Sequence, residues 1–252
     1  MKKDAALHSP TAADLYDLRT RHVSSDFPAL EKLIAPGSVV LEVGAGTGRV
    51  VRFLRTRGCD VVAVERDREK IRILRERFGN DPRVRVVEAD FGAGACSEKV
   101  DVVLFSFDVF SEFPRIEDRI AALTHAGELL RPNGAIILFN TVITRANELD
   151  TDAKFTFPIG DDVSGRYECE ITCRRFPLQG VSRCAVRYRP ITTAGGVTVE
   201  DQFTRALLTR NEQLTLFALH PDVETSSELD AKTLAPVSDQ TESIIHVLRK
   251  RR

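Results

Sequence analysis

Short apolar runs alternate with amphipathic helical patterns along the first 140 residues. The apolar runs lie at 39–43, 59–64, 84–87, 100–105 and 135–139. Each run has the length of a buried strand, and helical patterns fall between them. Strands that alternate with helices are typical of a doubly wound, mostly parallel sheet with helices on both faces. The pattern therefore predicts an α/β fold for this part of the chain.

The pattern changes to a period of two after residue 165. Apolar and polar side chains alternate at 166–175, 181–190 and 196–208, with Gln179-Gly180 and a glycine-rich turn at 194–196 between these segments. This predicts an inserted three-stranded antiparallel meander with one polar face. We expect the arginines of the meander to lie on that solvated face. They are Arg183, Arg187, Arg189 and Arg205.

The two ends of the chain carry further helical and strand patterns. Residues 10–35 are amphipathic and helical in period. Thr209 and Glu212 have the spacing of a capping box, which predicts a helix that begins there. Two short strands, near Val223 and at 244–248, are predicted to complete the sheet.

Composition and charge narrow the function. The 252 residues carry 36 basic and 37 acidic side chains, a net charge of −1, so no overall positive field favours nucleic acid or an anionic membrane. No apolar run reaches 18 residues, and we expect a soluble, cytoplasmic protein. The five cysteines form no CxxC pair. We expect them to be small buried side chains rather than metal ligands or redox groups, and we predict no metal site.

A glycine-rich loop follows the first predicted strand, in the pattern Glu42-x-Gly44-x-Gly46-x-Gly48. Glycine accepts a positive φ and lets the backbone approach a ligand closely. A dinucleotide fingerprint would need a glycine where Arg49 stands, and the ending of a P-loop is missing. The loop therefore predicts a cradle for a nucleoside cofactor of another kind.

This loop resembles motif I of the class I S-adenosylmethionine (SAM) dependent methyltransferases. The resemblance implies SAM as cofactor and a Rossmann-like sheet of seven strands. It also implies that Glu42 acts indirectly on the methionyl amino group and that the backbone of Gly44, Ala45, Gly46 and Gly48 passes beside the methionine and ribose. The turn Leu-Arg-Pro-Asn-Gly before 135 is similar to the Leu-x-Pro-Gly-Gly of the family. Proline should end the helix there, and glycine should take the left-handed turn. Asn133 stands where the family usually has a glycine, but asparagine tolerates the same backbone region.

Further cofactor contacts are predicted at the ends of later strands. Glu65 lies 21 positions after Gly44, the spacing at which such folds place an acid beside the ribose hydroxyls. The alternative is a solvated acid in a charged run. The resemblance implies that Asp90 and Phe91 contact the adenine. The full set of predicted cofactor residues also includes Tyr16, Arg66, Ser106 and Phe107.

The exit of the fourth strand, Ser106-Phe107-Asp108, is where the family keeps its catalytic loop. The chain has no evident His-acid dyad, so we favour N-methylation of a small amine, which needs only positioning and loss of a proton. Predicted catalytic residues are Tyr16, His22, Asp108 and Glu112. Methylation of oxygen or carbon on a phenol, hydroxyl or carboxylate metabolite is an alternative. A non-catalytic SAM-binding regulatory module is another, and a spermidine-synthase-like aminopropyl transferase on the same fold is a third.

The order of elements resembles, within the family, the small-molecule N-methyltransferases that act on amino sugars. That resemblance divides the chain into a helical lid, a SAM-binding core, an antiparallel insert, and a C-terminal helix with two strands. The insert could roof the substrate pocket or form a homodimer interface. The predicted bounds are 1–35, 36–145, 146–208 and 209–252.

Overall fold

The computed structural model describes residues 10–94, 96–143, 152–161, 165–191 and 197–251. Its helices are α1 Ala12–Thr20, α2 Phe27–Leu33, α3 Arg49–Thr56, α4 Arg68–Phe78, α5 Ile116–Leu129 and α7 Arg210–Leu219. The strands of the larger sheet are β1 Val39–Val43, β2 Asp60–Glu65, β3 Val84–Glu88, β4 Val100–Phe105, β5 Leu130–Thr141, β10 Val223–Asp230 and β11 Ser243–Lys250. The predicted turn at 194–196 lies outside the described residues. No helix of the described part is long and apolar enough to cross a membrane.

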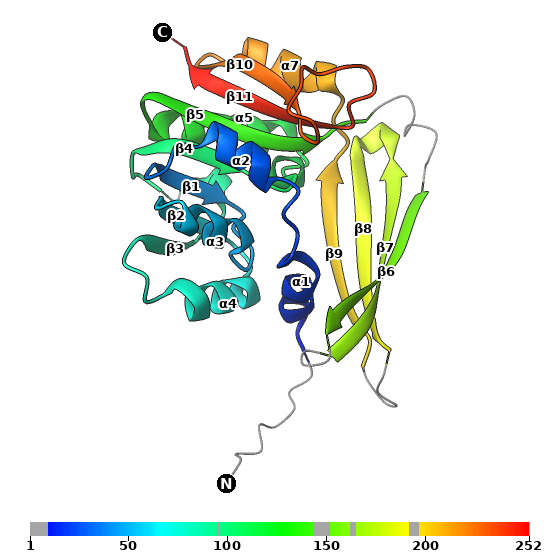
Figure 1. Ribbon diagram of the computed structural model, residues 1–252. Coiled ribbons are helices and arrows are strands. Elements are labelled where there is room, and N and C mark those ends of the chain that lie inside the picture. Colours follow the sequence, from blue (N-terminus) through cyan, green and yellow to red (C-terminus); the bar gives the residue numbers. More distant parts are fainter. Residues whose placement is uncertain (1–9, 95, 144–151, 162–164, 192–196, 252) are drawn as a thin grey trace.

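The larger sheet has seven strands, as predicted, and their order is β10-β11-β5-β4-β1-β2-β3 (Figure 1). β1 to β5 pair in parallel, and β11 joins β5 and β10 antiparallel. Separate apolar clusters cover its two faces. The strand order reverses direction between β1 and β4. In such sheets ligands bind outside the carboxyl ends of the strands at this switch point.

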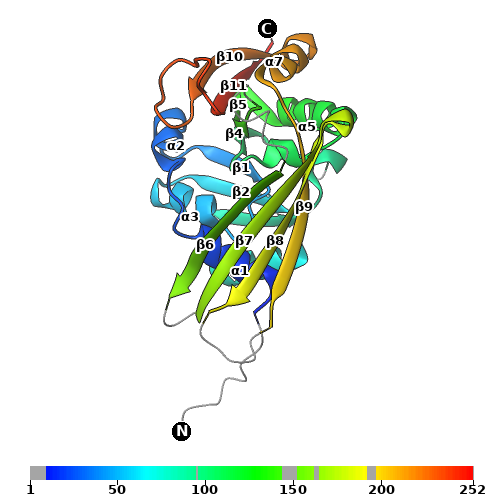
Figure 2. The same ribbon diagram turned by 90° about the vertical axis from the view of Figure 1, so that its right-hand side faces the viewer.

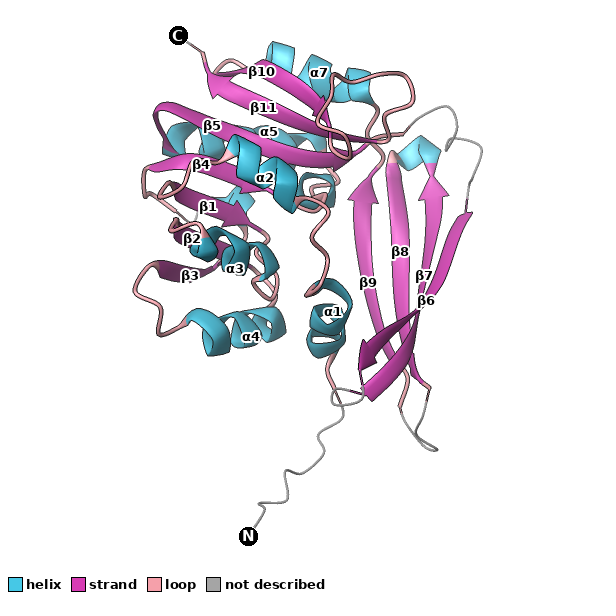
Figure 3. Ribbon diagram, in the orientation of Figure 1, coloured by secondary structure: helices cyan, strands magenta, loops and turns pink. Residues whose placement is uncertain are grey.

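A second sheet of four antiparallel strands stands beside the first (Figure 2). Its strands are β6 Asp152–Asp161, β7 Gly165–Phe176, β8 Val181–Pro190 and β9 Val199–Ala206. The sequence predicted three of them and missed β6. Pro158 and Gly160 interrupt the pattern of β6, but an edge strand tolerates both because its outer side needs no ladder hydrogen bonds. Figure 3 shows this sheet free of helices apart from α1 and a short turn.

The outer face of this sheet is polar. Glu170 pairs there with Lys154, Arg187 and Arg189, and Arg183 is exposed. The predicted solvated face is confirmed for these arginines. For Arg205 the prediction is wrong, because its side chain turns inward to Asp108.

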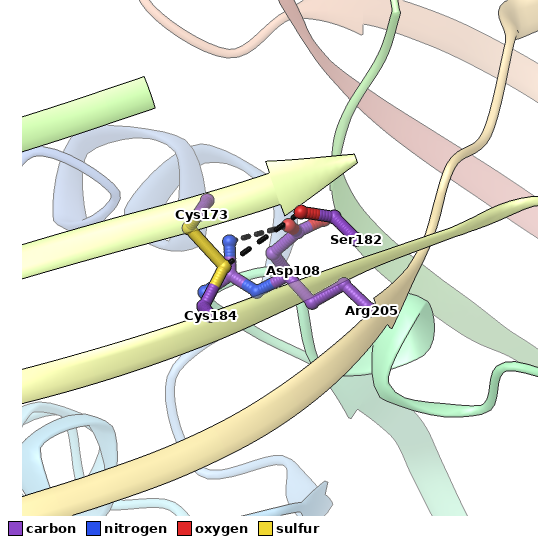
Figure 4. The surroundings of a disulfide bond; sticks show 5 residues. All are labelled: Asp108, Cys173, Ser182, Cys184 and Arg205. Atoms are coloured by element: carbon purple, nitrogen blue, oxygen red, sulfur yellow. Dashed lines mark hydrogen bonds and ion pairs between the residues drawn. A yellow bond between two sulfur atoms is a disulfide. The ribbon is translucent and has the colours of Figure 1, made fainter. Parts of the chain in front are cut away.

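Cys173 and Cys184 form a disulfide across β7 and β8 (Figure 4). The prediction that all five cysteines are small buried side chains without a redox role is therefore wrong for this pair. The strand register places the two residues directly opposite each other, with Cα atoms 4.1 Å apart. Cys59, Cys96 and Cys169 are free and buried, as expected.

The left-handed residue of the turn into β5 is the asparagine that stands in place of the usual glycine of the family. Asn133 takes the left-handed conformation, with φ at 66°. Gly134 is needed for space instead, because a Cβ there would lie 3.0 Å from the carbonyl oxygens of Arg131 and Asp101.

The N-terminal residues form two helices with different neighbours. α2 packs Leu30 and Ile34 into one core cluster of the larger sheet. α1 lies between α4 and the four-stranded sheet, where Leu15 and Leu18 contact the apolar face of the smaller sheet.

A buried ion pair fixes the other face of α1. The carboxylate of Asp17 accepts hydrogen bonds from both terminal nitrogens of Arg77 on α4 at 2.6 Å and from the hydroxyl of Thr47 at 2.8 Å. Arg77 also donates to the carbonyl of Thr47 at 2.9 Å. One group therefore joins α1, α4 and the glycine-rich loop.

We predict that Arg77→Gln lowers the free energy of unfolding by about 3 kcal/mol, because it leaves Asp17 buried without its charged partner. Arg72→Gln is the matched control, since Arg72 joins the same two helices through Asp14 at the surface. It should cost at most about 1 kcal/mol. Urea unfolding measures the free energy of unfolding of both variants. Equal losses would show that the pair of Asp17 and Arg77 stabilises the fold no more than the surface pair does.

Candidate active site

A cleft opens at the carboxyl ends of β1 and β4, between the larger sheet, α1 and β9. It brings together most of the predicted residues: Tyr16, Glu42, Gly44, Ala45, Gly46, Glu65, Arg66, Asp90, Phe91, Ser106, Phe107 and Glu112. His22, Gly48 and Asp108 do not line it. His22 is exposed after α1. Gly48 is required by packing, because a Cβ there would lie 2.5 Å from the Phe78 ring.

The glycine-rich loop has the backbone that the sequence predicts. Gly44, Gly46 and Gly48 all have positive φ angles, at 67°, 58° and 91°. Gly46 faces the ring of Tyr16, and a Cβ on this glycine would lie 3.3 Å from that ring and its hydroxyl. A side chain at this position would press on the Tyr16 ring and would be strained by the positive φ angle.

Glu65 holds the loop from the end of β2. Its Oε2 accepts from the backbone N–H of Gly46 at 2.8 Å. Its Oε1 accepts from the backbone N–H groups of Arg66 and Asp67 at 2.8 and 2.9 Å. Oε1 thereby uses both of its acceptor sites, and Oε2, which accepts from Gly46, keeps one acceptor site free. Glu65 is therefore buried, oriented and able to receive a hydroxyl from a ligand.

Glu42 is the most perturbed group of the cleft. It is almost fully buried in β1, where Oε1 accepts from the Ser106 hydroxyl at 3.0 Å. Oε2 has no partner among the described residues. Burial raises the pKa of Glu42 to about 8, against the opposing charge of Arg49. A cationic ligand beside this carboxyl group would favour its ionised form and supply the missing partner.

Asp108 has a different place from the one predicted. It follows β4 in a left-handed conformation, with φ at 69°, and its carboxylate accepts from the N–H of Thr141 and from Arg205 at 2.9 and 3.1 Å. Burial raises the pKa of Asp108, and Arg205 opposes this shift. Because these partners hold Asp108 outside the cleft lining, we assign it to the positioning of Arg205 rather than to contact with an amine.

Several lining residues were not predicted. Arg49 is held by Asp26 at 2.6 Å and lies over the Phe107 ring, 5.1 Å from its centroid. Lys70 lies 4.5 Å from the centroid of the Tyr16 ring. Five more polar or aromatic lining residues come from α1 and β9: Arg19, Asp201, Gln202, Phe203 and Arg205. No local motif marks these, since only the packing of β9 across the cleft brings them to the site.

Comparison with known proteins agrees with this geometry. Residues 40–134 match the family model described as a methyltransferase domain. The solved structure of the CcbJ methyltransferase from Streptomyces caelestis superposes with a TM-score of 0.79 at 19% identity, over 96% of this chain and 97% of that one. Residues 40–134 therefore carry a methyltransferase domain, and the chain has the fold of the class I SAM-dependent methyltransferases.

Two curated relatives match parts of the sequence. The cypemycin N-terminal methyltransferase of a Streptomyces species is 32% identical over 168 residues, 63% of this chain and 66% of the relative. The ribosomal RNA small subunit methyltransferase A of a Synechococcus strain is 54% identical over 52 residues, 21% of this chain and 18% of the relative. Both alignments span less than two thirds of the relatives' own lengths.

The cleft fits the cofactor of this methyltransferase family in three respects. The orphaned Oε2 of Glu42 suits a ligand with a positively charged amino group. The one free acceptor site on Oε2 of Glu65 suits a ribose hydroxyl. The bare backbone at Gly46 leaves room between the loop and Tyr16 that a side chain would fill.

We predict that Glu42 makes the ligand-free protein less stable as the pH rises. Between about pH 4.5 and 8 the folded chain keeps a proton on Glu42 that the unfolded chain releases, so stability falls by up to about 1.4 kcal/mol per pH unit from this group. Glu42→Gln removes this contribution and should flatten the profile. Urea unfolding at pH 5, 6.5 and 8 measures it, with Glu69→Gln on exposed α4 as control. An unchanged slope in Glu42→Gln would show that Glu42 ionises normally.

We also predict that Glu65→Gln weakens S-adenosylhomocysteine binding about tenfold to a hundredfold, since charge-assisted hydrogen bonds contribute about 1.5–3 kcal/mol. The NH2 group of the glutamine amide would also face backbone N–H groups that now donate to the carboxylate. Calorimetry should show no change for Glu69→Gln. Equal weakening in the two variants would remove Glu65 from the cofactor site.

Proposed function

We propose that this protein transfers a methyl group from SAM to the nitrogen of a small amine. The observation that carries the proposal is the acceptor side of the cleft. The cleft lining contains the carboxylate of Glu112 and the rings of Phe107, Phe113 and Phe203, and no histidine occurs in the described lining. Carboxylates and aromatic faces suit an ammonium group.

Two further facts support an amine. Catalysis on an alcohol or weakly acidic phenol requires a positioned base, and His22, the predicted base, is exposed outside the cleft lining. An amine with a solution pKa of about 8 to 9 needs only to lose a proton before it reacts. The relative that is 32% identical is named as an N-terminal methyltransferase, which is also a methylation of nitrogen.

The residues divide the work of the reaction between them. When bound, SAM supplies a methyl group on a sulfonium, ready for in-line attack by a lone pair. Glu42, held by Ser106, meets positive charge at the base of the cleft. Tyr16 covers the loop at Gly46 and limits access of water.

Glu112 receives the proton of the ammonium. Its contact with Arg66 is long, at 3.7 Å between half-exposed side chains, and a contact of this kind contributes at most about 1 kcal/mol. The carboxylate can therefore turn to an incoming ammonium. Its partial exposure lets the proton pass on to solvent.

The test is a panel of primary and secondary amines, phenols and carboxylates, with labelled SAM and identification of the methylated atom. We expect N-methyl products only. Glu112→Gln should lower kcat about 10²-fold, the scale of general acid–base catalysis, and Glu117→Gln on the exposed surface of α5 should leave it unchanged.

The outcome that contradicts the proposal is equally specific. A phenol preferred over every amine, with activity lost in His22→Ala and retained in Glu112→Gln, would assign O-methylation. A protein that binds S-adenosylhomocysteine but methylates no compound of the panel would favour the non-catalytic module.

A further inference from the structure

The wall of the cleft formed by α1 and β9 contains an arginine without a carboxylate partner. Other arginines in the lining are paired: Arg49 with Asp26, Arg66 with Asp90, and Arg205 with Asp108. Arg19 has no carboxylate within 4 Å among the described residues, and its Nε is buried with no acceptor there. A half-buried guanidinium group with no anion in a ligand cleft indicates that the anion comes from a ligand.

The same wall contains an unpaired acid. Asp201 on β9 accepts from the N–H of Gln202 at 2.8 Å, and in the described part of the chain it meets no cation within 4 Å. It is half-buried, like Arg19. No ion pair joins the two, although α1 and β9 are in contact. Two opposite charges that share a cleft and leave each other unpaired fit a ligand that carries both charges.

Arg19 lies toward the four-stranded sheet rather than toward the ribose end of the cleft. Its guanidinium carbon is 5.3 Å from the centroid of the Tyr16 ring. Burial raises the pKa of the Cys169 thiol on β7, and the charge of Arg19 opposes that rise. Burial also raises the pKa of Tyr188 on β8, again against the charge of Arg19. Lys70, by contrast, reaches Tyr16 from α4, the helix that follows Glu65.

We propose that the acceptor is zwitterionic, with its amine bound by Asp201 while Glu112 takes the proton of that amine, and with a carboxylate bound by Arg19. The inference rests on the proposed N-methyl transfer and names the substrate class. Arg19 offers the two parallel N–H donors that match a carboxylate. Phe203 lies between Asp201 and Arg205 on the same face of β9 and gives the apolar middle of the acceptor a surface.

The probes are glycine, β-alanine, 4-aminobutyrate and 5-aminovalerate, each compared with its own carboxamide. Calorimetry on protein saturated with S-adenosylhomocysteine measures their binding. We expect at least one amino carboxylate to bind tenfold to a hundredfold more tightly than its carboxamide. The series varies the distance between the two charges, so the preferred length reports the spacing of the site.

Variants assign the two charges. Arg19→Gln should abolish the preference for the carboxylate, and Arg19→Lys should keep part of it. Asp201→Asn should weaken the amino carboxylates at least tenfold but not the matched acid without an amine. Glu200→Gln is the control, because Glu200 lies next to Asp201 but pairs with Arg187 on the outer face. It should change nothing.

Equal binding of every carboxylate and its carboxamide would overturn the inference, and this comparison in the unmutated protein does not depend on how the variants fold. Loss of S-adenosylhomocysteine affinity in Arg19→Gln with the preference intact would also overturn it, since the guanidinium group would then serve the cofactor. If carboxamides are methylated as fast as carboxylates, N-methyl transfer is supported and the zwitterionic acceptor is contradicted. If amino carboxylates bind preferentially but are not methylated, the zwitterion site is supported and the proposed N-methyl transfer is contradicted.

Discussion

The arrangement of the cleft depends on the buried pair of Asp17 and Arg77. α1 has nine residues, and an isolated helix of that length is marginal in water. The pair fixes one face of the helix to α4 and to the loop at Thr47. The opposite face contacts the four-stranded sheet through Leu15 and Leu18. One short helix therefore sets the distance between the glycine-rich loop and β9, and with it the width of the cleft.

A second ion pair joins the two sheets at the far end of β9. Arg205 reaches across to Asp108, which the N–H of Thr141 also holds, and its guanidinium group stacks on Phe203 at 4.7 Å. Breaking this pair would leave a buried carboxylate behind, so the contact is costly to lose. The antiparallel insert is thereby attached to the core at both ends, by α1 and by the loop after β4, and its inner face becomes a wall of the site.

How much the sequence could predict depends on whether a feature is local. The structure has the local features as predicted: strand β1, the loop at Gly44 to Gly48 that follows it, and the capping box at Thr209. The disulfide is not local, because only the register of β7 on β8 places Cys173 opposite Cys184. Arg205 had a signal that the prediction overlooked. It shares the parity of Val199 and Phe203 on the apolar face of β9, whereas Arg183 and Arg187 alternate with the buried Cys184 and Val186.

The pattern of satisfied and unsatisfied polar groups separates the two halves of the cleft. On the ribose side the Glu65 carboxylate accepts hydrogen bonds from three backbone N–H groups, so the chain itself orients this carboxylate before a ligand binds. At the base Glu42 keeps one oxygen without a partner among the described residues, and burial raises the pKa of this carboxyl group. On the α1 and β9 side, Arg19 and Asp201, of opposite sign, have no ion-pair partner in the part of the chain that the structure describes. A buried or half-buried polar group without a partner costs free energy, so each of them indicates what the missing ligand atoms must be. Positive charge is required at Glu42, and both signs are required at the acceptor wall. A neutral amine acceptor would satisfy Asp201 after protonation but would leave Arg19 unpaired, which is why the charge pattern favours an acceptor with an acid of its own.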